Sequence, residues 1–115
     1  MSVERVRYDL TVYKGNDFRM YVYFKDNDGD AVDLTGWTGY AQVRDEKSAS
    51  GNLLCTFDVT VSGSEGKVTM ELTDDETSPD GNKGYYDLLM VDDEGFDETY
   101  VEGLVTFLDT VTVKS

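Results

Sequence analysis

Apolar and polar residues alternate along most of this chain, and the period of an amphipathic helix is nearly absent. The pattern is clearest in residues 18–25, where Phe, Met, Val and Phe occupy every second position and Arg, Tyr, Tyr and Lys lie between them. Such alternation places one set of side chains on the buried face of a strand and the other set in solvent. The chain is therefore predicted to be all-β. Similar alternation marks the other expected strands, within residues 8–13, 37–44, 53–61, 68–72, 86–90 and 100–107.

Short polar segments rich in Gly, Asp, Asn and Ser separate the expected strands, at residues 14–17, 26–30, 45–52, 62–66, 73–84 and 92–95. Turns every eight to twelve residues or so are typical of an antiparallel sandwich or barrel. We therefore predict an antiparallel Ig-like β-sandwich of about seven or eight short strands. The longest irregular stretch, residues 73–84, is the expected crossing from one sheet to the other.

The sandwich is expected to form a single domain over residues 1–115. Its core should extend over about residues 6–108. Residues 109–115, which include Val111 and Val113, are expected to form a short last strand or an extended C-terminal tail. Such a tail could pair with a strand of a neighbouring subunit.

Three side chains have expected roles that the strand pattern does not specify. Trp37, the only Trp, heads a strand whose other inward residues are small, so it is expected to plug one end of the core; stacking on a sugar is the alternative. Cys55 lies in the apolar run LLCTF and is expected to be buried, with no second Cys for an intramolecular disulfide. Thr73 and Glu76 fit a capping box, which predicts at most one helical turn before Pro79.

One acidic segment admits both a structural and a metal-binding interpretation. Asp26, Asp28 and Asp30 alternate as in the opening of an EF-hand calcium loop. However, Gly29 falls before the third acidic position, and Trp37 occupies the twelfth position, where a Glu is needed. Asp-Gly between alternating segments is a strong hairpin signal, and Val32 and Leu34 would begin the next strand. We predict a hairpin turn here and keep Asp26, Asp28 and Asp30 as weak metal-ligand candidates.

The balance of charges excludes several classes of partner. The chain has 24 Asp and Glu against 10 Lys and Arg, a formal net charge of −14. Nucleic-acid-binding proteins neutralise phosphates with clustered Lys and Arg, so we expect no nucleic-acid partner. Anionic membranes are disfavoured for the same reason. The acidic surface is expected to maintain solubility or to meet a basic partner surface.

Catalytic patterns are also missing from the sequence. The chain has no His, which removes Ser-His-Asp and Cys-His arrangements and His-based metal sites. It has no glycine-rich phosphate loop. Pairs of carboxylates are unspecific among 24 acidic residues, so we expect neither an enzyme nor a cofactor. We also expect no secretory signal in MSVERVRYDL and no membrane span, hence synthesis in a cytoplasm.

Six short motifs follow one another along the chain: Lys14-Gly15-x-Asp17-Phe18, Asp26-x-Asp28-Gly29, Val32-Asp33-Leu34-Thr35-Gly36-Trp37, Ala41-Gln42-Val43-Arg44-Asp45, Gly84-x-Tyr86-Asp87-Leu88 and Tyr100-Val101-Glu102-Gly103. In this order they resemble the N-terminal Ig-like β-sandwich domain of phage baseplate upper proteins, and small tail or fibre-associated proteins that share it. The resemblance covers roughly residues 9–113. It implies a virion structural module without catalytic residues, which anchors a fibre or receptor-binding component to the tail, usually as a symmetric oligomer.

The resemblance implies that the partners are other virion structural proteins and further copies of the chain. Baseplate proteins carry a C-terminal region after this domain, whereas this sequence stops at Ser115, which favours an adaptor, decoration or accessory subunit. We therefore expect a non-enzymatic phage virion protein that acts as a tail, baseplate or fibre adaptor. One alternative is a capsid decoration or head accessory protein. The other is a carbohydrate- or calcium-dependent binding module that uses Trp37, outward tyrosines and the acidic turns.

Overall fold

A computed structural model describes residues 6–77 and 81–111. Within these residues it contains nine strands and one short 3-10 helix. The strands are β1 (Val6–Arg7), β2 (Leu10–Tyr13), β3 (Phe18–Tyr23), β4 (Thr38–Arg44), β5 (Leu53–Thr56), β6 (Asp58–Ser62), β7 (Lys67–Leu72), β8 (Lys83–Val91) and β9 (Asp97–Leu108). The helix, η1 (Gly63–Glu65), lies in the turn between β6 and β7. The all-β prediction is confirmed.

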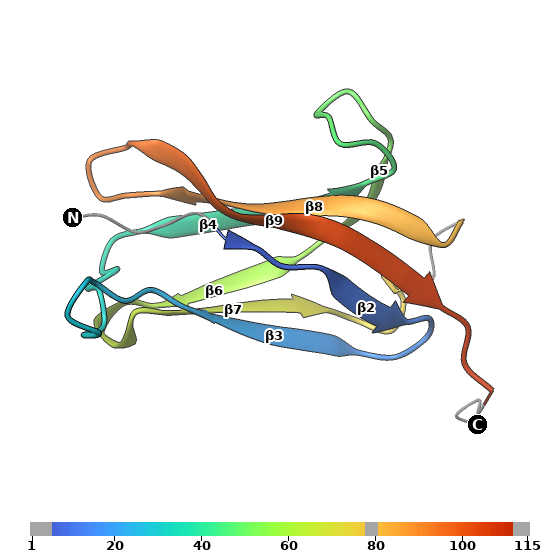
Figure 1. The fold of residues 1–115 in the computed structure, drawn as a ribbon, viewed down its shortest axis with the longest axis horizontal. Coiled ribbons are helices and arrows are strands. Elements are labelled where there is room, and N and C mark those ends of the chain that lie inside the picture. Colours follow the sequence, from blue (N-terminus) through green and yellow to red (C-terminus); the bar gives the residue numbers. More distant parts are fainter. Residues whose placement is uncertain (1–5, 78–80, 112–115) are drawn as a thin grey trace.

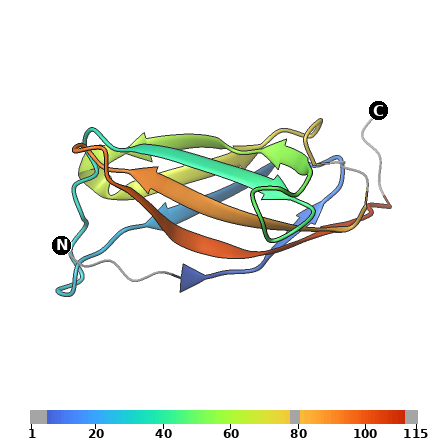
Figure 2. The same cartoon turned by 90° about the horizontal axis from the view of Figure 1, so that it is seen from above.

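The strands form two sheets that face each other (Figure 1). The large sheet has the order β1-β9-β8-β4-β5, with β2 also pairing with β9, and the small sheet has the order β3-β7-β6. Figure 2 shows the β8–β9 hairpin extending along most of the long axis. The predicted sandwich is therefore the observed architecture.

The described residues contain no helix with the length and apolar character of a membrane span.

Side chains that alternate in the sequence fill the space between the sheets. On β8, Tyr86, Leu88 and Met90 are buried, and every second residue of β9 from Val101 to Phe107 is buried as well. The small sheet contributes Val68, Met70 and Leu72 of β7. Inward residues of facing sheets exclude water from each other, so the alternating pattern becomes one continuous core.

The N-terminal strands differ from the antiparallel prediction. Both β1 and β2 run parallel to β9, with Val6 opposite Val101 and Leu10 opposite Val105. All other strand pairs in the two sheets are antiparallel. Parallel strands need a long connection between them, and here nearly the whole domain connects β1 and β2 to β9. Alternation within a few residues therefore gave no sign that these strands run parallel to β9.

The long alternating segment at residues 53–61 is two strands rather than one. β5 belongs to the large sheet and β6 to the small sheet, and the chain changes sheets at Phe57, whose backbone N–H donates to the Ala41 carbonyl at 2.9 Å. Both halves face the same interior, so the alternation continues through the crossing. The predicted crossing at 73–84 also exists, because it joins β7 of the small sheet to β8 of the large one.

Three local predictions need a correction or a limit. The hairpin turn at 26–30 forms, but an isolated Lys25–Ala31 bridge replaces the expected partner strand, and Val32 and Leu34 are buried as loop. β3 pairs with β7 instead. At Thr73–Glu76 the chain forms a single turn, within the predicted limit of one helical turn, and the Thr73 N–H donates to the Glu76 Oε1 at 3.1 Å as in a capping box; Pro79 lies outside the described residues. Residues 109–111 form no strand, and Val113 lies outside the described residues.

Candidate interaction surfaces

The two acidic turns share one backbone geometry. In the first, the Asp26 Oδ1 accepts hydrogen bonds from the N–H groups of Asp28 and Asp30, each at 3.0 Å. In the second, the Asp92 Oδ1 accepts from the N–H groups of Glu94 and Phe96, each at 2.9 Å. The fourth residue of each turn is a Gly with a φ of 85°, which L side chains rarely adopt. Each leading Asp therefore stabilises its turn.

The structure brings the three metal-ligand candidates together. Carboxylate oxygens of Asp26, Asp28 and Asp30 lie within 4.8 Å of one another, and all three residues are exposed. The Asp26 Oδ1 is already occupied by two N–H donors. In the second turn, Glu94 and Phe96 occupy the positions of Asp28 and Asp30, so the turn does not need a carboxylate at both positions. Turn geometry therefore explains Asp26 but not the pair Asp28 and Asp30. Calcium binding by this group stays the alternative to a purely structural turn.

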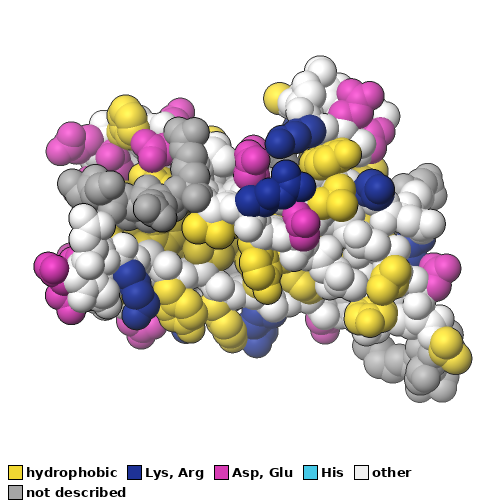
Figure 3. All heavy atoms as spheres, in the orientation of Figure 1, with side chains coloured by type: hydrophobic (Ala, Val, Ile, Leu, Met, Phe, Trp, Pro, Cys, Tyr) yellow, Lys and Arg dark blue, Asp and Glu magenta, His cyan; other side chains and the backbone are white. Residues whose placement is uncertain are grey.

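Both acidic turns lie at the same end of the sandwich (Figures 1 and 2). Figure 3 shows acidic side chains gathered at this end. Just inside it, the Trp37 ring packs 6.4 Å from the Phe24 ring and 6.4 Å from the Tyr100 ring, measured between centroids. The prediction that Trp37 plugs one end of the core is confirmed. Trp37 remains half-buried, and these aromatic contacts account for its position without a sugar ligand.

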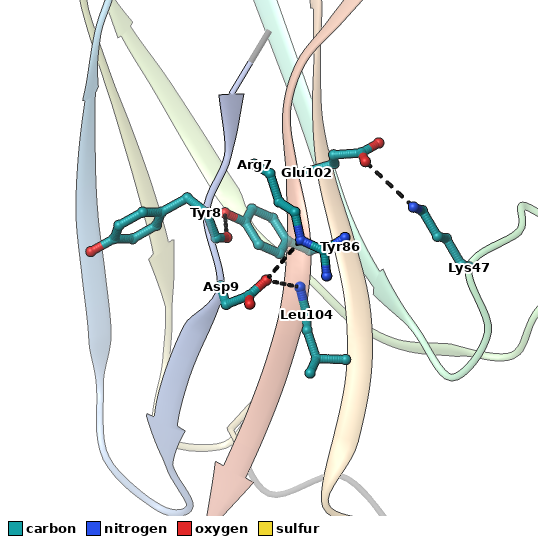
Figure 4. A network of polar contacts seen from close by, with 7 residues as sticks. All are labelled: Arg7, Tyr8, Asp9, Lys47, Tyr86, Glu102 and Leu104. Carbon is teal, nitrogen blue, oxygen red and sulfur yellow. Dashed lines mark hydrogen bonds and ion pairs between the residues drawn. The ribbon is translucent and has the colours of Figure 1, made fainter.

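A kink between β1 and β2 is held by side chains of the large sheet (Figure 4). At the kink, the Tyr86 hydroxyl donates to the Tyr8 carbonyl at 2.6 Å. Next to it, the Asp9 Oδ1 accepts from the Leu104 N–H at 2.9 Å, replacing a backbone carbonyl in the ladder. The kink passes so close to Gly103 that a Cβ there would lie 2.7 Å from the Tyr8 carbonyl carbon. Burial raises the pKa of Tyr86, and nearby Asp9 adds to the effect, so Tyr86 stays a hydrogen-bond donor.

A hollow of about 390 Å³ lies on the outer face of the large sheet, between β1 and the β4–β5 loop. Its walls combine three cationic side chains, three carboxylates and other polar and aromatic groups. The lining residues are Arg7, Gln42, Arg44, Glu46, Lys47, Ser48, Ala49, Tyr85, Tyr86, Asp87, Glu102 and Gly103. Sequence reasoning missed this hollow. Its only signal was the set of outward polar positions on neighbouring strands, whose pairing was unknown.

Charged side chains across the hollow form a row set by strand register. Glu102 of β9 lies opposite Arg7 of β1 on one side and opposite Asp87 of β8 on the other. The Lys47 Nζ lies 3.4 Å from a Glu102 carboxylate oxygen (Figure 4). Partial burial raises the pKa of Asp87, Glu102 raises it further, and Arg44 opposes them. Among the described residues, the Asp87 carboxylate has no side-chain hydrogen bond and no ion pair within 4.0 Å, although Arg44 acts on it electrostatically, so its oxygens can accept from a ligand.

Arg44 holds the rim of this hollow in place. Its guanidinium donates to the Gly51 carbonyl at 2.9 Å and to the Gln42 Oε1 at 2.8 Å. Next to it, Asp45 also joins the two ends of the loop, because its Oδ1 accepts from the Asn52 N–H at 2.8 Å. The loop is therefore tied to the sheet by its own sequence, although it carries no regular secondary structure.

Cys55 is buried, as predicted. Burial raises the pKa of its thiol to about 11, with a further increase from the Glu76 carboxylate. A thiol is a nucleophile only when it is ionised. Cys55 is therefore a packing residue near neutral pH.

Aromatic side chains remain exposed on both faces and at one end of the molecule: Tyr8, Tyr13, Tyr21, Tyr23, Tyr40 and Phe96. On the small sheet, the Lys67 Nζ lies 4.9 Å from the centroid of the Tyr21 ring. Beside it, the Arg19 guanidinium contacts the Glu71 carboxylate at 2.8 Å. Exposed tyrosines are common in surfaces that bind other proteins, because they supply contact area with little loss of conformational freedom.

Comparisons with known proteins agree with this architecture. A family model described as "LtfC-like, beta-sandwich domain" matches residues 4–107. A search of curated proteins finds no match. Among solved structures, one described as "GspB Siglec domain" is similar with a TM-score of 0.55 and 15% identity. The alignment covers 93% of this chain and 57% of that one, so this chain spans little more than half of its length. At that identity the likeness shows the fold alone.

Proposed function

The chain belongs to the LtfC-like β-sandwich domain family, and from this membership we propose a non-enzymatic structural subunit of a bacteriophage virion. Its role would be that of an adaptor or assembly module of the tail, baseplate or fibre. Support comes from the ordered motifs that resemble baseplate upper proteins. They span nearly the same residues as the family match, and they lie in the turns and strands of the sandwich itself.

The observation that carries this proposal is the exposed aromatic surface. Tyr21 and Tyr23 on the small sheet and Tyr40 on the large sheet are each about half exposed. Burial of large aromatic side chains contributes strongly to protein association. Exposed aromatics on opposite faces suit a subunit that neighbours contact from more than one side.

The charge distribution indicates the kind of neighbour. With a net charge of −14 and acidic turns gathered at one end, the subunit would meet a basic surface of another virion protein there. Its other partners would be copies of itself within a symmetric assembly. We propose no nucleic-acid or membrane partner, and a location in the virion.

Mass spectrometry of purified particles tests the proposal. Whole virions should contain the protein, and heads stripped of their tails should have lost it. Retention on stripped heads in many copies would replace the tail assignment with capsid decoration. Absence from both preparations would refute the virion assignment.

The hollow on the large sheet favours a second candidate function, a carbohydrate-binding module. Tyr85, Gln42 and Asp87 offer an aromatic ring, an amide and an unpaired carboxylate to sugar hydroxyls. Titration with neutral and acidic sugars, followed by amide NMR, should then shift residues that line the hollow. Asp87→Asn should weaken that binding, and Asp58→Asn on β6 serves as the control. An unchanged spectrum with every sugar would exclude this candidate.

A further inference from the structure

We propose that the free edge of β3 pairs antiparallel with β3 of a second copy of this chain, which joins two small sheets into one. The inference deepens the assembly role proposed above and rests on it for its biological meaning. It concerns the purified protein in solution, so it can fail while the virion assignment stands.

An exposed sheet edge offers unpaired N–H and C=O groups to another strand, and most proteins protect such edges. On the large sheet, β1 has two residues, while β2 and β5 have four each. The pairing of β5 is also interrupted by a register shift between Val43 and Arg44. On the small sheet, the other edge strand, β6, has five residues and begins with Asp58, and the residue before it, Phe57, hydrogen-bonds to Ala41 of the large sheet, which draws that end of β6 toward the other sheet.

β3 has none of these protections. It is six residues long and pairs without a register shift, and β7 is its only strand partner within the described residues. β2 and β3 diverge from the turn that joins them (Figure 1), and β2 pairs with β9 of the large sheet rather than with β3. The inward side chains Phe18, Met20 and Val22 remain only half-buried. Figure 3 shows hydrophobic side chains in a row along this side, over β2 and β3.

Strand register identifies which backbone groups face outward. The Phe24 N–H donates to the Gly66 carbonyl at 2.7 Å, in register with the β3–β7 ladder. Hydrogen-bonding direction alternates along a strand, so the N–H and C=O groups of Arg19, Tyr21 and Tyr23 point away from β7. These outward groups are the ones that a new strand would bind.

A second β3 fits this edge by symmetry. With Tyr21 opposite the same residue of the other copy, Arg19 would face Tyr23 across a twofold axis, and Met20 would face Val22. Three hydrogen-bonded residue pairs would supply about six backbone hydrogen bonds. On the outer face, the two Tyr21 rings would lie side by side, and on either side of them Arg19 of one copy would contact Tyr23 of the other. On the inner face, the half-buried apolar side chains of the two strands would pack against each other.

Local charge favours a second copy at this edge. Residues 18–25 contain Arg19 and Lys25 and no carboxylate, although the chain as a whole carries −14. Two copies repel each other through acidic groups that lie away from β3, whereas no carboxylate of one β3 strand would face a carboxylate of the other. Salt screens the distant repulsion, so this dimer should strengthen as salt rises. An acidic surface that binds a basic partner would show the opposite salt dependence.

Sedimentation equilibrium of the full chain tests the proposal, between about 0.05 M and about 0.5 M NaCl. Tyr21→Lys places two cations opposite each other at the twofold axis. Thr60→Lys is the matched control, because Thr60 lies in the same cross-strand row on the other edge strand, β6. We expect a dimer whose dissociation constant falls as the salt concentration rises. Tyr21→Lys should raise this dissociation constant at least about tenfold, whereas Thr60→Lys should leave it unchanged.

A monomer at all concentrations, a trimer or larger ring, or equal effects of the two variants would overturn the proposal. Amide hydrogen exchange of the unmodified chain provides a test that no variant's folding can affect. The amides of Arg19, Tyr21 and Tyr23 should be protected at high protein concentration and exchange faster on dilution. Exchange that does not depend on concentration would also overturn it.

Discussion

Gly103→Ala should strongly destabilise the fold, although it adds only one methyl group. In β9, Gly103 lies beneath the kink between β1 and β2. A Cβ at this position would lie 2.7 Å from the Tyr8 carbonyl carbon and closer still to its oxygen, and 3.1 Å from the Asp9 Oδ1. Real Cβ atoms do not approach backbone atoms this closely, so the N-terminal segment must move away from β9.

The size of the effect follows from what that movement breaks. It would lengthen the Tyr86–Tyr8 and Asp9–Leu104 hydrogen bonds, each worth about 1 kcal/mol. It would also strain the packing of Leu10, which is 5% exposed, for about 1 kcal/mol more. We expect a loss of about 3 kcal/mol, or about 12 °C in Tm for a domain of this size.

Urea unfolding and thermal unfolding measure the loss, with Thr106→Ala on the same strand as the control. The control should stay within about 0.5 kcal/mol, because Thr106 faces outward. Hydrogen exchange should show early loss of protection at the Tyr8 amide, which donates to the Glu102 carbonyl at 2.9 Å. A Gly103→Ala protein within about 1 kcal/mol of the unmodified chain would refute the close-contact argument.

Three further outcomes are expected. Tyr86→Phe should lower the free energy of unfolding by about 1–2 kcal/mol, because the Tyr8 carbonyl loses its donor in a partly buried site; an unchanged urea midpoint would contradict this. Asp26→Ala and Asp92→Ala should each cost about 1 kcal/mol, because each carboxylate accepts two backbone N–H groups. Asp28→Ala, whose side chain does not hold the turn, should cost under about 0.5 kcal/mol in the same urea titrations. The stability that Cys55 contributes, measured against Cys55→Ala, should be fully present below about pH 8.5, the pKa of an unfolded thiol. It should decline as pH rises toward about 11, because the unfolded thiol ionises first; urea titrations at several pH values would show no such decline if the thiol were exposed.

Some residues of the candidate surfaces could be assigned from local sequence. Asp26 and Asp92 were recognisable as turn residues, because an Asp followed three positions later by a Gly between two alternating segments is typical of a hairpin turn, and both turns form the same hydrogen bonds. Trp37 was recognisable as an end plug, because its strand offered small inward neighbours. The hollow was not recognisable, because Arg7, Gln42, Lys47 and Glu102 meet only after β1, β4, β8 and β9 have taken their order in the sheet.

The sequence by itself determined the strands, their inward faces and most of the turns, because alternation and turn chemistry act over a few residues. It also determined the acidic character of the surface. Only the tertiary structure decided that β1 and β2 run parallel to β9, that the chain changes sheets at Phe57, and that β3 is left with an open edge. These features depend on which distant strands become neighbours, and local alternation is the same for every choice of neighbour.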